Sequence, residues 1–181
     1  MTIGSPNRAR TDIVNRILTI SNRLPVSVAD KDGTLEFTKS VGGLATGLSS
    51  LNTPVKTHWI GWPGIASDGL TPKNRAELDH QLDKMACSPV HLSSKDVQEY
   101  YLGFSNETIW PLFHYFNLYC RFDQASWEAY VRVNQAFFDE VCRTYEPGDT
   151  VWIHDYQLML LPEMIRAHFP EASIGFFLHI P

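Results

Sequence analysis

The sequence predicts an α/β fold, a Rossmann-like parallel sheet flanked by helices. Short, continuous apolar runs recur along the chain, as in strands that are buried on both faces. Helical patterns separate these runs, and such alternation is typical of parallel sheets with right-handed crossover connections. Hydrophobic residues make up 44% of the 181 residues and charged residues 19%. That balance provides enough apolar material for the core of one domain.

Five apolar runs are the predicted strands. None of them alternates between apolar and polar residues, so each is expected to lie inside the sheet and not on a solvated face. In chain order they are residues 16–21 (RILTIS), 57–62 (THWIGW), 87–92 (CSPVHL), 150–154 (TVWIH) and 173–178 (SIGFFL).

Helical patterns fill the connections between these strands. Thr71 precedes a proline at a first helical position, which is typical of an N-cap, and Ser93 with Asp96 resembles a capping box. The longest pattern places apolar side chains at i, i+3, i+4 and i+7, a stripe that we interpret as core packing. The predicted helices cover residues 43–51, 72–85, the segment after Ser93 that carries Tyr100 and Tyr101, 123–145, and 158–168 before Pro170.

Composition excludes several classes of protein. A net charge of -5 argues against a nucleic-acid binder, which normally shows a basic patch, and no apolar run approaches the ~20 residues that span a bilayer. Residues 1–15 lack the apolar core of a secretory signal and are interpreted as a flexible tail. The three cysteines, Cys87, Cys120 and Cys142, are far apart and odd in number. They favour free thiols in a reducing compartment, and hence a cytoplasmic location.

Polar and aromatic side chains follow the carboxyl ends of the predicted strands. Ligands bind at this edge in open parallel sheets. Arg23 follows the first strand, Trp62 closes the second, His154 and Asp155 come at the end of the fourth, and His179 follows the fifth. A purely structural sheet needs none of these groups there, so their concurrence predicts a ligand site.

Each of these residues also has a structural interpretation. Arg23 either pairs with a local acid or captures a phosphate through its planar guanidinium. Asp155 is equally typical of an N-cap for the following helix, and His154 and His179 are typical of buried histidines. The Gly-Gly pair that ends at Gly43 opens a helix, which suits anion binding by backbone N–H groups, but a tight turn explains the pair as well.

The segment YYLGFSNETIWP, residues 100–111, is rich in aromatic side chains. Aromatic packing is one interpretation, and a wall that stacks on the C–H bonds of a sugar is the other. The first strand is not followed by the GxGxxG pattern, which argues against a dinucleotide-binding dehydrogenase. No histidine or carboxylate spacing is diagnostic of a metal site, so no metal is expected.

Seven segments together resemble the trehalose-6-phosphate synthases of glycosyltransferase family 20, retaining enzymes of GT-B architecture. The resemblance spans residues 17–181. It implies transfer of glucose from UDP-glucose to glucose 6-phosphate, giving trehalose 6-phosphate and UDP, with no cofactor and no metal in the chemical step. The segments are SNRLPV, VGGLATGL, GWPG, EYYLGFSNETIWPLFHY, WEAYVRVNQAF, VWIHDYQLMLLP and IGFFLHIP.

The resemblance also implies an acceptor site. Arg23 matches the arginine that grips the phosphate of glucose 6-phosphate. Trp62, Tyr101 and Trp110 match the aromatic wall around the same molecule.

On the donor side, the resemblance places Gly43 near the diphosphate of UDP-glucose. Asp155 and His179 are implied as the catalytic pair at the donor sugar, where they position and stabilise it for front-face attack and do not act as nucleophiles. Gln157 stands where some members of the family carry histidine, and we assign it no chemistry.

The resemblance implies that residues 16–181 are an N-terminal, acceptor-side domain whose nucleotide-sugar-binding partner domain is absent. We therefore expect the chain to be a truncated piece of a longer protein and to be inactive alone. A homo-oligomer or a trehalose-synthesising complex is the expected assembly. The alternative function is a non-catalytic, synthase-like module that regulates or scaffolds such a complex. The presence of all the matched site residues favours a catalytic parent.

Overall fold

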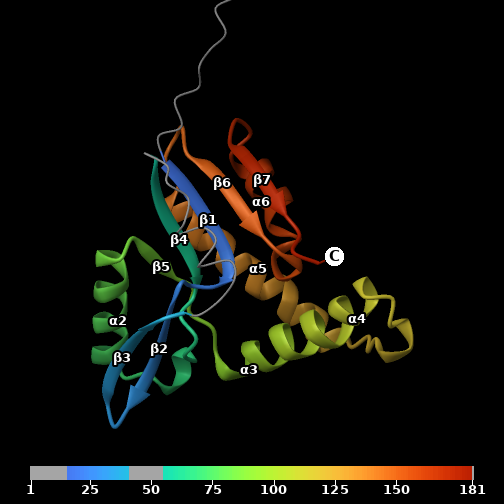
Figure 1. Cartoon of the computed structure of the whole chain (residues 1–181), viewed down its shortest axis with the longest axis horizontal. Helices are drawn as coiled ribbons and strands as arrows, with labels where there is room; N and C mark the ends of the chain where they lie inside the picture. The colour runs from blue at the N-terminus through green and yellow to red at the C-terminus, as the bar shows by residue number, and fades with distance from the viewer. Residues whose placement is uncertain (1–15, 41–54, 181) are drawn as a thin grey trace, which may run out of the picture.

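A computed structural model describes residues 16–40 and 55–180. The predicted tail at 1–15, the predicted helix at 43–51 and Gly43 lie outside these residues. Five parallel strands form the central sheet in the order β5-β4-β1-β6-β7 (Figure 1). They are β1 (Arg16–Arg23), β4 (Lys56–Trp62), β5 (Cys87–Pro89), β6 (Thr150–His154) and β7 (Ser173–Phe177). All five predicted strands and the parallel α/β fold are confirmed, although β5 ends at Pro89 and not at Leu92 as predicted.

β1 lies at the centre of the sheet, with β4 on one side and β6 on the other. Leu18 and Ile20 of this strand are fully buried, as its continuous apolar run predicts. The strand order reverses direction at β1, and the carboxyl ends of the strands around such a point form the usual ligand crevice of an open α/β sheet. The sequence motifs at the ends of β1, β4 and β6 are therefore brought to one place.

Helices cover the sheet (Figure 1). The expected N-caps are confirmed, because the Thr71 side chain accepts a hydrogen bond from the N–H of Asn74 and the Ser93–Asp96 capping box is formed. The longest helix buries Tyr130, Phe137 and Val141 against the sheet. The helices are η1 (Ser67–Gly69), α2 (Pro72–Lys84), α3 (Ser94–Asp96), the π-helical η2 (Val97–Ile109), α4 (Trp110–Phe113), η3 (Asn117–Tyr119), α5 (Gln124–Thr144), η4 (Tyr156–Leu158) and α6 (Leu161–His168).

The last helix starts later than predicted. A 3-10 turn, η4, follows β6, and α6 begins only at Leu161. Pro162 occupies its first turn, where the missing proline N–H costs no hydrogen bond. The prediction of one helix over 158–168 was therefore wrong at its start.

An antiparallel hairpin of β2 (Val26–Lys31) and β3 (Thr34–Lys39) was not predicted. Its turn is Asp32-Gly33, with both φ angles positive, as a two-residue type I′ turn requires. The Asp-Gly pair was the available signal. The hairpin packs against α2 through a second small core that includes Val28, Leu78 and Leu82.

Cys87, Cys120 and Cys142 are free thiols, as expected. None of the helices within the described residues combines the length and the apolar character that crossing a membrane requires.

Candidate functional site

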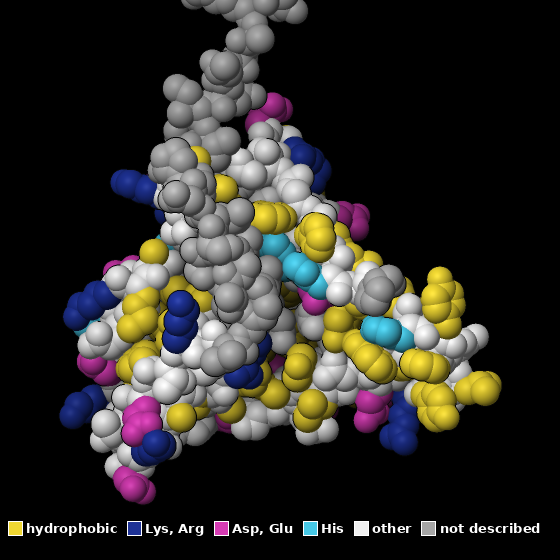
Figure 2. Space-filling view, viewed as in Figure 1, with side chains coloured by type: hydrophobic (Ala, Val, Ile, Leu, Met, Phe, Trp, Pro, Cys, Tyr) yellow, Lys and Arg dark blue, Asp and Glu magenta, His cyan; other side chains and the backbone are white. Residues whose placement is uncertain are grey.

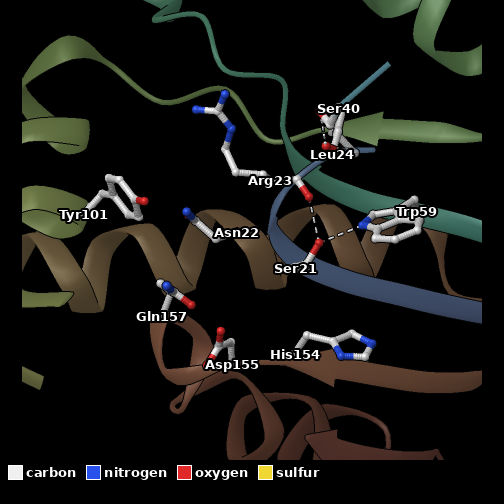
Figure 3. Close-up of a pocket in the computed structure, with 10 residues that line it drawn as sticks. All are labelled: Ser21, Asn22, Arg23, Leu24, Ser40, Trp59, Tyr101, His154, Asp155 and Gln157. Carbon is white, nitrogen blue, oxygen red and sulfur yellow. Dashed lines mark hydrogen bonds between the residues drawn. The ribbon is translucent and has the colours of Figure 1, made fainter. Parts of the chain in front are cut away.

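A pocket of about 220 Å³ lies at the carboxyl edge of the sheet (Figure 3). Larger hollows of about 440 and 630 Å³ lie between α2 and α5 and between β3 and α2, and neither contains a strand-end residue of the predicted site. We assign the site to the smaller pocket because the predicted chemistry converges there. Its lining residues are Ser21, Asn22, Arg23, Leu24, Ser40, Trp59, Tyr101, His154, Asp155 and Gln157.

A bulge at the end of β1 shapes this pocket. Ile20 pairs with Ile60 and Arg23 pairs with Trp62, so β1 has one residue more than β4 over this stretch. Successive strand residues normally point to opposite faces, and an extra residue breaks that alternation. Consecutive residues at the end of β1 therefore line one pocket. Gly61 allows the close approach of the strands, because a Cβ there would lie 2.8 Å from the Ser21 carbonyl oxygen.

Arg23 extends its guanidinium along the pocket (Figure 3). The guanidinium carbon lies 4.6 Å from the ring centroid of Trp62, within cation–π range. Among the described residues no carboxylate lies within ion-pair distance of Arg23. Within the described residues, the interpretation of Arg23 as the partner of a local acid is therefore not supported. Its guanidinium is available to an anion.

Asp155 is held in a strained conformation at the end of β6, with φ 76° and ψ 169°. Its N–H donates to the Phe177 carbonyl oxygen at 2.8 Å. Its Oδ1 accepts from the N–H of Tyr156 at 3.0 Å and from the N–H of His179 at 3.4 Å. The capping interpretation of Asp155 is therefore confirmed. Non-glycine residues with positive φ concentrate at functional sites, so a capping role and a chemical role are compatible for Asp155.

His154 is buried, as one interpretation of the sequence expected. Its Nδ1 lies 3.0 Å from Nε2 of His179, and its own Nε2 is buried without a hydrogen-bond partner. Burial, and secondarily the nearby His179, lower the pKa of His154 to about 4. The imidazole is consequently neutral near pH 7, and the pair links β6 to the segment after β7.

Other predicted residues lie outside the pocket lining. Trp62 is only 6% exposed, donates from Nε1 to the Ile65 carbonyl oxygen at 2.9 Å, and its ring lies against the Arg23 guanidinium. Trp110 stands on α4, where its ring stacks on His114 with centroids 4.1 Å apart. The structure thus brings together Arg23, Tyr101 and Asp155 in the pocket, with Trp62 and His179 in contact with those residues.

Five polar or aromatic lining residues received no role from the sequence: Ser21, Asn22, Ser40, Trp59 and Gln157. The Trp59 indole donates to Ser21 Oγ at 2.7 Å, and that hydroxyl donates to the Arg23 carbonyl oxygen at 2.7 Å. Gln157 is 7% exposed, and its Oε1 has no hydrogen-bond partner. The segments SNR and HDYQ contained Ser21, Asn22 and Gln157. The bulge in β1 brings the neighbouring residues Ser21, Asn22 and Arg23 to the same pocket, and residue order alone does not reveal it.

The arrangement suits a small, hydroxylated anion. A guanidinium, carboxamides, a phenol and a carboxylate face one open hollow, and such groups bind phosphate oxygens and hydroxyls in preference to apolar ligands. Residues 15–181 match glycosyltransferase family 20. The chain belongs to that family.

Curated and solved relatives agree with this assignment. The chain is 44% identical over 173 residues to the UDP-forming alpha,alpha-trehalose-phosphate synthase of Yarrowia lipolytica, covering 91% of this chain and 36% of the relative. The crystal structure of the UDP-forming synthase of Burkholderia xenovorans in complex with glucose-6-phosphate matches with a TM-score of 0.66 and 28% identity, over 92% of this chain and 34% of that one.

A third relative is named as a phosphatase and not as a synthase. The N-terminal domain of the Candida albicans trehalose-6-phosphate phosphatase matches with a TM-score of 0.71 and 29% identity, over 97% of this chain and 36% of that chain. The chain spans about a third of the length of the curated relatives that it matches. These likenesses confirm the prediction of a GT-B glycosyltransferase fold.

Proposed function

We propose that residues 16–181 are the acceptor-side domain of a retaining glucosyltransferase. The complete enzyme transfers glucose from UDP-glucose to glucose 6-phosphate and releases trehalose 6-phosphate and UDP. The observation that carries this proposal is the Arg23 guanidinium, which lines the pocket without an acidic partner among the described residues. The glucose-6-phosphate complex of the Burkholderia xenovorans synthase supports it.

The acceptor roles follow from this arrangement. Arg23 binds the phosphate, and Tyr101 offers a ring and a hydroxyl to the sugar. Trp62 acts by holding the guanidinium in place. Trp110 retains its proposed place in the aromatic wall through the family resemblance alone.

The donor roles concern the opposite side of the pocket. Asp155 and His179 position the donor sugar, with the Asp155 carboxylate oriented by the N–H groups of Tyr156 and His179. Fixed groups of this kind stabilise developing charge without reorganising during the reaction. Gly43 is proposed for the donor diphosphate on resemblance alone.

A non-catalytic, synthase-like module remains the second candidate. The likeness to the N-terminal domain of the Candida albicans phosphatase favours it, because that protein has the same fold but is named for a phosphatase activity. Retention of Arg23, Tyr101 and Asp155 in one pocket favours the catalytic parent instead.

The expected location is the cytoplasm, in keeping with the free thiols. Self-association is supported by a group of exposed apolar side chains around η3, visible at the right of Figure 2. They are Tyr115, Phe116, Leu118, Tyr119 and Phe122, exposed by 52% or more. Sedimentation of the chain tests this part of the proposal, and a monomer at all concentrations contradicts it.

Calorimetric titration of the chain with glucose 6-phosphate, with glucose as the control ligand, tests the function. We expect saturable binding of the phosphorylated sugar only. Arg23→Ala should weaken it about 10- to 100-fold, the effect of losing a charge-assisted hydrogen bond. Arg75→Ala, which removes an arginine from the hollow between α2 and α5, is the matched control. Equal affinity of the Arg23 variant for the sugar phosphate contradicts the proposal.

A further inference from the structure

Asn22 lies at the floor of the pocket, one residue before Arg23. Its side chain is 8% exposed, and its Oδ1 accepts a hydrogen bond of 3.1 Å from the hydroxyl of Tyr100. Tyr100 is fully buried on η2 and lies 78 residues away in sequence. One buried hydrogen bond therefore joins the end of β1 to the helix that supplies Tyr101.

This hydrogen bond sets the orientation of the Asn22 amide. Burial, and secondarily the neighbouring tyrosines, raise the pKa of Tyr100 well above its ordinary value, so the phenol keeps its proton and donates it. Among the described residues the phenol has no other acceptor than Asn22 Oδ1. Because a carboxamide carries its oxygen and its NH2 group on opposite sides, fixing the oxygen toward Tyr100 directs Nδ2 away from it.

The NH2 group consequently faces the pocket. Figure 3 shows Nδ2 of Asn22 pointing into the space between Tyr101 and Arg23. Within the described part of the chain, Nδ2 of Asn22 donates no hydrogen bond. It is also absent from the fully buried polar atoms without a partner in that part of the chain, so it is accessible from the pocket. It is an accessible donor on a side chain that is otherwise buried.

We propose that Asn22 binds the substrate phosphate together with Arg23, and that Tyr100 is the positioning residue that orients its amide. This inference rests on the proposed function and deepens it. A phosphate monoester presents three terminal oxygens that act as acceptors, and the planar fork of an arginine contacts two of them. The NH2 group, which donates only, is chemically matched to the remaining oxygen.

The bulge in β1 is what makes this pairing possible. In a regular strand Asn22 and Arg23 would point to opposite faces of the sheet, whereas here both line one pocket. The strand end thereby combines a charged and a neutral donor, and the neutral one is pre-oriented before any ligand arrives. Pre-orientation of this kind reduces the entropy lost on binding.

The test compares three variants by calorimetric titration with glucose 6-phosphate and with inorganic phosphate. Asn22→Ala should weaken binding of both ligands about 10-fold, the effect of one hydrogen bond to a charged group. Asn22→Asp keeps an acceptor for Tyr100 but removes the donor and adds a negative charge that repels the phosphate, so it should weaken binding more than Asn22→Ala does. Tyr100→Phe should weaken binding about threefold, because the amide then loses its fixed orientation.

Val141→Ala is the matched control for stability. Val141 is fully buried on α5 and does not line the pocket, so its truncation lowers stability without touching the site. Affinity equal to that of the unmodified chain in Asn22→Asp, or an equal loss of affinity in Val141→Ala, overturns the role of Asn22.

Comparing glucose 6-phosphate with inorganic phosphate distinguishes the remaining outcomes. Loss of affinity for glucose 6-phosphate with unchanged affinity for inorganic phosphate means that the amide contacts a sugar hydroxyl, and it overturns the phosphate assignment. If the unmodified chain does not bind glucose 6-phosphate, the proposed function fails along with this inference. If it binds and Asn22→Ala binds equally well, only the inference fails.

Discussion

His154 should make the stability of this protein depend steeply on pH. It is 1% exposed at the end of β6, its Nδ1 contacts His179, and its Nε2 has no hydrogen-bond partner. Protonation would add a charge and an unpaired donor to this buried position. Burial first, and His179 second, lower its pKa from 6.5 to about 4.

The sign and size of the effect follow from these values. In the unfolded chain His154 takes up a proton as the pH falls through 6.5, whereas in the folded protein it resists protonation down to about pH 4. Its contribution is therefore fully present above pH 6.5 and is lost between pH 6.5 and 4. The loss amounts to about 3 kcal/mol at most, a large part of the stability of an ordinary domain.

Urea denaturation at fixed pH values from 8 to 4, with tryptophan fluorescence as the signal, measures this loss. The pKa values of His58 and His91 are also lowered, chiefly by burial, so the whole protein loses more than this one group explains. The His154→Asn variant isolates it, because asparagine is uncharged throughout and keeps a donor near His179. We expect the free energy of unfolding of the unmodified chain to fall relative to the variant by about 3 kcal/mol between pH 7 and 4. A difference that stays constant over this range refutes the reasoning.

Two backbone positions give further predictions. Gly64→Ala and Gly33→Ala place alanine at φ +92 and +84 and should each cost about 1 kcal/mol in denaturation experiments. Only Gly64→Ala should also weaken glucose 6-phosphate binding, because its Cβ would lie 2.7 Å from Arg23 Nη2 whereas nothing lies within 4 Å at Gly33; equal affinities would contradict this. The free energy of unfolding of Asp155→Gly should be about 1 kcal/mol higher than that of Asp155→Ala. Both variants lose the hydrogen bond to Tyr156, but only glycine relieves the φ of 76°. Equal stabilities would show that the backbone is unstrained.

Much of the fold could be predicted because its signals are local. Strand 150–154 is found at the predicted bounds, and Asp123 and Tyr145, the ends of the predicted long helix, are its N-cap and C-cap. Thr71 and Ser93 cap their helices as expected. A continuous apolar run or a capping residue acts through neighbours a few positions away, so the sequence alone contains the information. The hairpin of β2 and β3 was missed although its Asp-Gly turn is an equally local signal.

The site was only partly predictable. Residues directly after a strand, such as Arg23 and Asp155, follow from the rule that ligands bind at the carboxyl edge of a parallel sheet. Asn22 does not follow from it, because its place beside Arg23 in the pocket depends on a bulge between strands that are 33 or more residues apart. Trp59 does not follow from it either, because this residue lies within β4 and not after its end. Trp62, predicted as part of the aromatic wall of the acceptor site, is not among the residues that line the pocket, and its ring contacts the Arg23 guanidinium.

The sequence by itself determined the α/β class, the strands and the strand-end groups, since periodicity and chain order specify them. The tertiary structure alone decided which of those groups meet. It placed the hydroxyl of Tyr100 against Asn22 and the imidazole of His154 against His179, in contacts that join residues 78 and 25 positions apart. The orientation of an amide and the protonation of an imidazole are set by the partner and the burial that folding supplies, and neither is encoded in the residues next to them in the chain.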